Sequence, residues 1–186
     1  MVKTASNMLA LGTEAANFSL KDMVSGDIIK LKTAAQYSKA TLIFFICNHC
    51  PYVLHIIEKL SEVLGSYQQS QITILAINSN DPNQYPEDSP EKMKQFAEQH
   101  GFSFPYLFDE TQEVASTYHA ACTPDFFLYN QNLELIYRGQ FDDSRPGNTI
   151  PVTGADLKNA IDCVLNNLPN EAPQKPSLGC NIKWST

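Results

Sequence analysis

The sequence lacks clustered basic residues, long apolar runs near its start and low-complexity segments. It has 13 Lys and Arg against 20 Asp and Glu, which gives a net charge of -7, and the cations are scattered along the chain. Because a polyanion-binding protein concentrates positive charge on one face, we expect neither nucleic acid nor a membrane as a partner. The apolar patch at residues 8–11 is too short for a signal-peptide core or a membrane span, so we predict a cytoplasmic protein.

Cysteine is too scarce and too unevenly spaced for a secreted disulfide scaffold. The five cysteines are Cys47, Cys50, Cys122, Cys163 and Cys180. In a reducing compartment, a close pair such as Cys47 and Cys50 is more often catalytic or metal-binding than structural. A four-ligand zinc site needs a second pair at similar spacing, which the sequence does not contain. We therefore expect no metal and no cofactor, only a redox-active disulfide between these two residues.

The segment around this pair organises the remaining chain. Residues 41–46 are apolar or β-branched and predict a strand buried on both faces. Beyond the cysteines, apolar residues recur at helical spacing from Val53 to Tyr67 and predict a helix. We expect Cys47 to lie exposed at the helix start, where backbone N–H groups stabilise a thiolate, and Cys50 to be more buried. Cys47 is then the predicted nucleophile, and Cys50 resolves the mixed disulfide.

The other periodic segments predict an α/β fold with a central mixed β-sheet flanked by helices, preceded by an N-terminal β-hairpin. We expect one domain over residues 1–168 and a C-terminal tail, residues 169–186, packed on it and anchored by the ring of Trp184. The predicted strands lie in a hairpin at residues 17–31, at 71–77, at 104–108 and in a second hairpin at 125–138. Three further helices are predicted. Ser89 caps the first, Asp109 and Gln112 open the second, and the third, at 157–165, follows a capping box at Thr153.

Several short motifs carry a family resemblance. They are Asn-Phe-Ser-Leu at residues 17–20, Cys-Asn-His-Cys-Pro at 47–51, Asp-Glu at 109–110 and Thr-Pro at 123–124. Over residues 12–168 the sequence resembles thioredoxin-fold proteins of the redoxin group, peroxiredoxin-like (AhpC/TSA) and TlpA/ResA-like. Within that group it is similar to a bacterial thioredoxin-like subfamily with a CNHCP motif. The resemblance implies a thiol–disulfide oxidoreductase that reduces or oxidises a disulfide in a protein or small molecule, with an electron donor such as a thioredoxin system.

The resemblance also implies roles for individual residues. Pro124 is expected to form a cis peptide bond facing the two cysteines, and the Thr123 backbone to pair with an extended substrate. His49 is expected to stabilise the Cys47 thiolate, which would make the couple more oxidising than thioredoxin at about -270 mV. Cys122 and Cys180 are possible accessory thiols, either in a redox relay, bridged to each other, or buried and free.

One expected component is missing from the sequence. Residues 41–46 contain no Asp or Glu, so the buried carboxylate that transfers protons in thioredoxin is absent from the central strand. The proton acceptor for Cys50 is therefore unassigned, with Glu113 as a weak candidate.

Three alternatives remain open. A thiol peroxidase needs Pro-x-x-x-Thr/Ser-x-x-Cys, but Ala40 and Phe44 occupy the first two defined positions before Cys47. A Sco-like Cu(I)-binding protein would use Cys47, Cys50 and His119, although such proteins usually space the cysteines by three residues. A non-enzymatic sensor or scaffold would bind a partner through the polar loop at residues 78–90.

Overall fold

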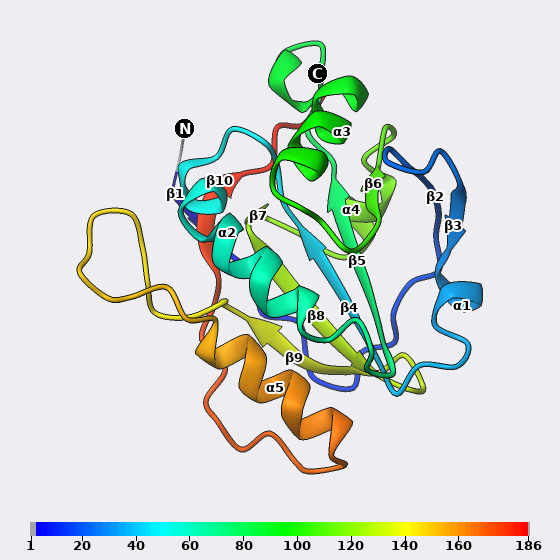
Figure 1. The fold of residues 1–186 in the computed structure, drawn as a ribbon, viewed down its shortest axis with the longest axis vertical. Helices are drawn as coiled ribbons and strands as arrows, with labels where there is room; N and C mark the ends of the chain where they lie inside the picture. The colour runs from blue at the N-terminus through cyan, green and yellow to red at the C-terminus, as the bar shows by residue number, and fades with distance from the viewer. Residues whose placement is uncertain (1–2, 186) are drawn as a thin grey trace.

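The computed structural model describes residues 3–185, which form an α/β fold around a central mixed sheet (Figure 1). The sheet has seven strands in the order β3-β2-β6-β5-β4-β8-β9. This architecture confirms the predicted fold class. The strands are β2 (Ser19–Asp22), β3 (Ile28–Lys30), β4 (Ala40–Phe45), β5 (Ile72–Asn78), β6 (Tyr106–Phe108), β8 (Asp125–Asn130) and β9 (Leu135–Gly139).

Strand β4 lies near the middle of the sheet and separates two apolar cores. It pairs parallel with β5 on one side and antiparallel with β8 on the other. Because side chains alternate along a strand, Leu42 and Phe44 pack into one core and Ile43 and Phe45 into the other. Helices α2 (Pro51–Gly65), α3 (Pro90–Gln99) and α5 (Ala155–Leu165) cover the first core, whereas the short helices α1 (Leu31–Ala34) and α4 (Glu113–Thr117) lie against the second.

Local signals explain several boundaries. The hairpin of β2 and β3 extends the sheet edge through the pairing of β2 with β6. Ser89 caps α3 by accepting a hydrogen bond from the Lys92 backbone N–H, as predicted. The other two predicted caps are confirmed in part. The Asp109 carboxylate accepts hydrogen bonds from the Val114 and Ala115 N–H groups at the start of α4, but Gln112 makes no side-chain cap and takes a φ of 62°. Thr153 accepts a hydrogen bond from the Ala155 N–H, but the N-cap residue of α5 is Gly154, with a φ of 68°. Gly154 favours this left-handed conformation because it lacks a Cβ atom.

A second, three-stranded sheet was not predicted. It consists of β1 (Lys3–Ala5), β10 (Leu178–Asn181) and β7 (Cys122–Thr123), with β10 in the middle and antiparallel to both neighbours. These strands are too short to show a periodic sequence pattern. Figure 1 shows β10 (red) beside β1 (blue), near the N-terminal end of α2, against which β10 packs. The predicted anchor is also corrected: Trp184 is 45% exposed, and the buried apolar side chains of the tail are Cys180 and Ile182.

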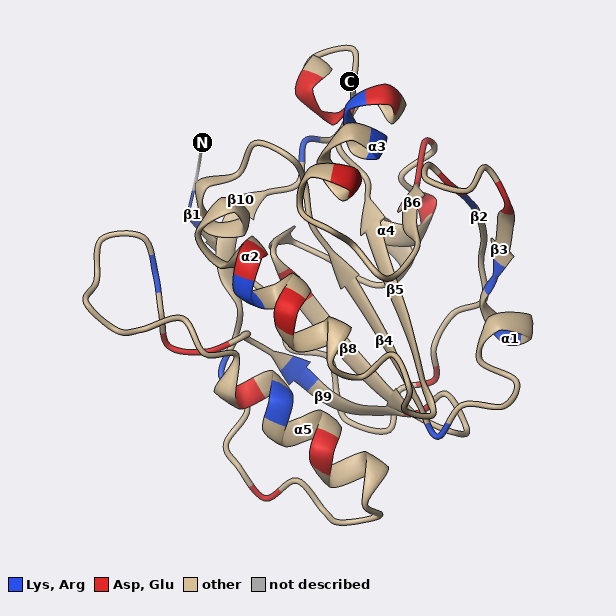
Figure 2. Cartoon of the chain, in the orientation of Figure 1, with Lys and Arg blue, Asp and Glu red and all other residues tan. Residues whose placement is uncertain are grey.

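Two further observations concern the surface. Figure 2 shows Lys and Arg dispersed over several helices and strands. Within residues 3–185, no helix combines the length and apolar character that a bilayer-spanning helix needs.

Candidate active site

The two cysteines of the Cys-x-x-Cys motif lie in the turn that joins β4 to α2. Pro51 is the first residue of α2, and its fixed φ suits that position, so Cys50 becomes the N-cap residue. Cys47 lies three residues earlier, outside the helix. The prediction that Cys47 occupies the helix start is therefore wrong. The prediction that it is exposed is also wrong, because Cys47 is 1% and Cys50 0% exposed.

The Thr123–Pro124 loop faces both sulfur atoms. The peptide bond between these residues is cis, as the resemblance implied. Thr123 Oγ1 lies 3.3 Å from Cys47 Sγ, and its carbonyl oxygen lies 3.3 Å from Cys50 Sγ. One expectation needs correction: the Thr123 backbone is not open to a substrate in this structure, because it pairs with Cys180 of strand β10.

Strand β10 brings a third thiol into the site. Cys180 is 4% exposed, and its Sγ lies 2.6 Å from Cys50 Sγ, although 130 residues separate the two in sequence. Gly179 permits this approach, since a Cβ atom there would lie 1.9 Å from the Thr123 carbonyl oxygen. All five cysteines are free thiols. Three sulfurs therefore share one buried site, with Cys50 in contact with both others.

The pKa values of the three thiols separate strongly. The pKa of Cys50 is lowered to about 5, mainly by a hydrogen bond with Cys47. Burial opposes this shift. Hydrogen bonds from the Cys180 thiol and from the backbone N–H groups of Val53 and Cys180 lower the pKa further. The hydrogen bond to Cys50, burial and the Asp88 charge raise the pKa of Cys47. Burial and Cys50 raise the pKa of Cys180 to about 12. Of the three thiols, Cys50 is therefore the one whose thiolate form the cluster favours.

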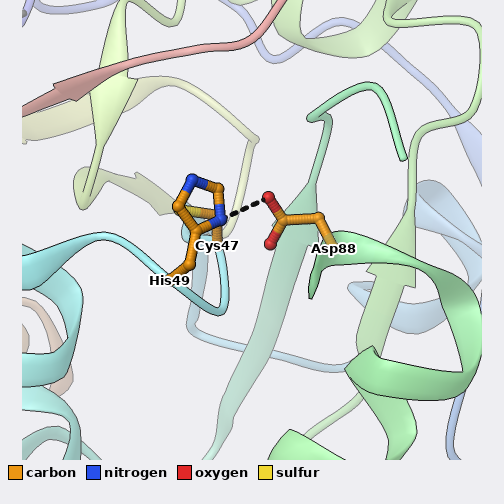
Figure 3. Close-up of side chains that lie close together, drawn as sticks. All are labelled: Cys47, His49 and Asp88. Carbon is orange, nitrogen blue, oxygen red and sulfur yellow. Dashed lines mark ion pairs between the residues drawn. The ribbon is translucent and has the colours of Figure 1, made fainter. Parts of the chain in front are cut away.

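A buried carboxylate, Asp88, lies next to the cysteine turn. It comes from the 3-10 helix η1 (Pro86–Asp88) after β5, and His49 and Asp88 point toward one another (Figure 3). His49 Nδ1 lies 2.9 Å from Asp88 Oδ2, a distance at which the two form an ion pair when the imidazole is protonated. The Asp88 carboxylate raises the pKa of His49 against the effect of burial.

The Asp88 side chain also holds the cysteine turn in place, because it accepts a hydrogen bond from the backbone of that turn. Its Oδ1 accepts hydrogen bonds from the Asn48 N–H at 2.8 Å and from Asn78 Nδ2 at 3.2 Å, and its Oδ2 accepts one from Asn80 Nδ2 at 2.8 Å. Burial raises the pKa of Asp88, but these bonds and His49 together lower it below its ordinary value. Asp88 is thus an ionised, fully buried group, which costs less because it is hydrogen-bonded.

The sequence did not single out Asp88, because it lies within the polar loop at residues 78–90, which was considered only as a partner-binding segment. The available signal was the position of this polar loop at the carboxyl end of β5, the edge where open α/β sheets bind ligands. Glu113, the candidate weighed instead, is exposed at the start of α4, and α4 packs on the opposite face of the sheet from α2. The buried carboxylate next to the cysteine turn therefore comes from a loop and not from the central strand.

Among residues 3–185, the group with metal-ligating side chains in mutual reach is Cys47, His49 and Asp88, whose ligand atoms lie within 4.8 Å of one another. Both Asp88 oxygens already accept hydrogen bonds, and a metal ion would have to compete with these donors. His119, the third ligand considered for copper, is not in this group; it is exposed in the turn after α4. The donor set favours a polar network over a metal centre.

The remaining cysteines are not in the sulfur cluster. Cys122 is buried in β7, and its thiol lies 3.7 Å from the Pro124 carbonyl oxygen. Burial raises the pKa of Cys122. Cys163 lies half-buried in α5.

Lys183 is a site neighbour that the sequence did not indicate. Its Nζ lies 5.6 Å from the centre of the Tyr85 ring, and Tyr85 in turn stacks on His49 with the ring centres 5.5 Å apart. Its backbone bonds to Asn80 and Asp81, which ties the C-terminal tail to the loop that carries Asp88.

The fold and the cis-proline loop that faces the paired cysteines define a thioredoxin-fold protein. Residues 11–138 match the AhpC/TSA family, and the chain belongs to this family. It is 24% identical to the thiol–disulfide oxidoreductase ResA of Geobacillus thermodenitrificans over 129 residues, which cover 69% of this chain and 68% of ResA.

Solved structures agree with this assignment. An uncharacterised conserved protein from Geobacillus kaustophilus superposes with a TM-score of 0.96 at 50% identity, covering 100% of this chain and 97% of that one. The thioredoxin domain of a thiol–disulfide oxidoreductase from Bacteroides vulgatus superposes with a TM-score of 0.65 at 17% identity, covering 86% of this chain and 100% of that one. The latter likeness shows the fold.

Proposed function

We propose that this protein is a thiol–disulfide oxidoreductase that cycles Cys47 and Cys50 between dithiol and disulfide. The observation that carries the proposal is the contact of both sulfurs with Thr123, at 3.3 Å each, beside the cis-proline. The substrates are disulfides in a protein or small molecule. A dithiol donor such as a thioredoxin system exchanges electrons with the pair.

Cys47 is the attacking thiol in this proposal. Cys180 covers Cys50, whereas Cys47 lies beside His49, whose side chain is 21% exposed. Cys47 has a raised pKa and shares a hydrogen bond with the Cys50 thiolate. Cys50 is therefore placed to accept the Cys47 proton as Cys47 attacks, which identifies a base for the first step.

The steps balance as follows. Cys47 Sγ attacks one sulfur of the substrate disulfide, the substrate S–S bond breaks, one substrate thiolate leaves, and Cys50 takes the proton. Cys50 Sγ then attacks Cys47 Sγ, the mixed disulfide breaks, and the second substrate thiolate leaves with that proton. The substrate gains two electrons, and Cys47 and Cys50 end as a disulfide. In the reverse direction the same steps oxidise a substrate dithiol.

Asp88 and His49 are positioning residues in this scheme. Asp88 fixes the turn through the Asn48 N–H, and it raises the pKa of His49, whose ring lies beside Cys47. Cys50 also raises the pKa of His49, so a proton on His49 and a thiolate on Cys50 stabilise each other.

The test uses oxidised glutathione as the substrate and mass spectrometry as the readout. Cys50→Ser should accumulate one glutathione on Cys47, because the resolving thiol is gone. The wild type should instead lose two hydrogens and retain no glutathione. The double variant with Cys47→Ser and Cys50→Ser should give neither product, and Cys163→Ser should match the wild type. If Cys50→Ser carries no glutathione on Cys47, the proposal fails.

Two of the alternatives have weaker support. The peroxidase motif needs Pro and Thr or Ser where this chain has Ala40 and Phe44. For copper, the third ligand considered, His119, is exposed in the turn after α4 and does not lie with Cys47, His49 and Asp88. Stoichiometric peroxide or competition with a Cu(I) chelator would test these alternatives.

A further inference from the structure

The C-terminal strand β10 occupies the position beside the cis-proline where an incoming extended chain would pair. Cys180 pairs with Thr123, and Asn181 pairs with Cys122, in antiparallel register. The strand is fixed on its other edge by β1 and at its start by Ser177, whose hydroxyl donates to the Pro124 carbonyl oxygen at 2.6 Å. The protein therefore holds a cysteine-bearing segment of its own against the Cys-x-x-Cys motif.

We propose that Cys180 is a third redox thiol, which takes over the disulfide from Cys50. This inference rests on the proposed function of Cys47 and Cys50. In the exchange, Cys180 Sγ attacks Cys50 Sγ, the Cys47–Cys50 bond breaks, and the Cys50–Cys180 bond forms. The Cys180 proton passes to Cys47, which leaves as a thiol. No electrons are gained or lost overall, so no further oxidant is needed.

The geometry favours this exchange over a merely buried thiol at position 180. The two sulfurs are 2.6 Å apart, against about 2.05 Å in a disulfide bond, so bond formation needs little movement. Cys122 provides the contrast within the same sheet, because its sulfur has the Pro124 carbonyl as a neighbour rather than a thiol.

The proton balance also suits the direction of the exchange. Cys47 has a raised pKa and therefore keeps a proton readily when it leaves the disulfide. Burial and Cys50 raise the pKa of Cys180, an effect that the nearby Lys183 cation partly offsets, so Cys180 gives up its proton as it attacks. The oxidised form then stores its disulfide between α2 and the C-terminal strand, with Cys47 regenerated as a thiol.

The test is a disulfide map of the oxidised full chain. The reduced wild type receives one equivalent of oxidised glutathione, is quenched in acid, alkylated and digested, and its crosslinked peptides are identified by mass spectrometry. We expect a peptide that joins Cys50 to Cys180, with Cys47 alkylated. Cys180→Ser should lose this peptide and retain the Cys47–Cys50 crosslink. Cys163→Ser is the matched control and should keep the wild-type map.

Each outcome has a separate meaning. A wild-type map with only the Cys47–Cys50 crosslink and with Cys180 alkylated overturns the relay but leaves the proposed function intact. A map without any crosslink among these three cysteines overturns both. Because the wild-type map decides the matter, the result does not depend on whether Cys180→Ser folds.

Discussion

Replacing Gly179 with alanine tests whether the close approach of β10 sets the reactivity of Cys180. The new Cβ atom would lie 1.9 Å from the Thr123 carbonyl oxygen, whereas ordinary C···O contacts begin at about 3.3 Å. Strand β10 must therefore move away from Thr123 by roughly 1.4 Å, the difference between these distances. Because a misplacement of about 1 Å can slow a reaction about 100-fold, we expect Cys50–Cys180 crosslinking to slow by about that factor.

The assay is the time course of the crosslinked peptide after a pulse of oxidised glutathione. Gly65→Ala is the matched control, because the nearest atom to its Cβ is Ser103 Oγ at 4.0 Å, which leaves room for a methyl group. The Gly179→Ala variant should also lose about 1–3 kcal/mol of unfolding free energy from overpacking. If it forms the Cys50–Cys180 crosslink at the wild-type rate, the reasoning from the strand contact is refuted.

Three other predictions follow from the charges at the site and in the core. The thiolate absorbance near 240 nm should appear as the pH rises through about 5 and vanish below it, because the pKa of Cys50 is lowered. Asp88→Asn should lower the pKa of His49, followed by the NMR titration of its ring protons, because the neighbouring carboxylate raises it. Arg138→Ala should lower the unfolding free energy by about 3–5 kcal/mol in urea denaturation, because the buried Asp125 carboxylate is left unpaired. Lys175→Ala should have no measurable effect, because its ion pair with Asp143 is exposed.

Matched variants sharpen these measurements. Cys50→Ser should abolish the low-pH thiolate signal, and a signal that persists in it would move the charge to another cysteine. Glu87→Gln changes the exposed carboxylate next to Asp88 and should leave the His49 titration unchanged. An equal shift in both carboxylate variants would indicate a general effect of net charge. An Arg138→Ala variant as stable as the wild type would show that the ion pair contributes nothing.

The sequence predicts the main sheet well because its strands are continuous apolar runs. Residues 41–46 and 71–77 predict β4 and β5, and the change to helical spacing after Cys50 predicts α2. These segments are specified locally, through burial and periodicity. The Thr123–Pro124 motif gave the cis-proline only through family resemblance, because most X-Pro bonds are trans.

The rest of the site could not be predicted because it depends on contacts that are distant in sequence. Asp88 lies 40 residues from Asn48, and its role depends on how the loop after β5 folds back over the turn. The pairing of β10 with β7 depends on the absence of a side chain at Gly179, which no periodic pattern reveals. The ionisation of the cluster follows from three-dimensional proximity of the sulfurs.

The long sequence separation between Cys50 and Cys180 has a consequence for synthesis of the chain. The Cys-x-x-Cys motif emerges from the ribosome 130 residues before its third thiol, so during translation it exists as a simple dithiol. Domains fold largely from their N-terminal side as synthesis proceeds, and oxidation at this stage is limited to the Cys47–Cys50 bond. The three sulfurs come together only when β10 docks. Most of the fold is therefore synthesised before its reactive site is complete.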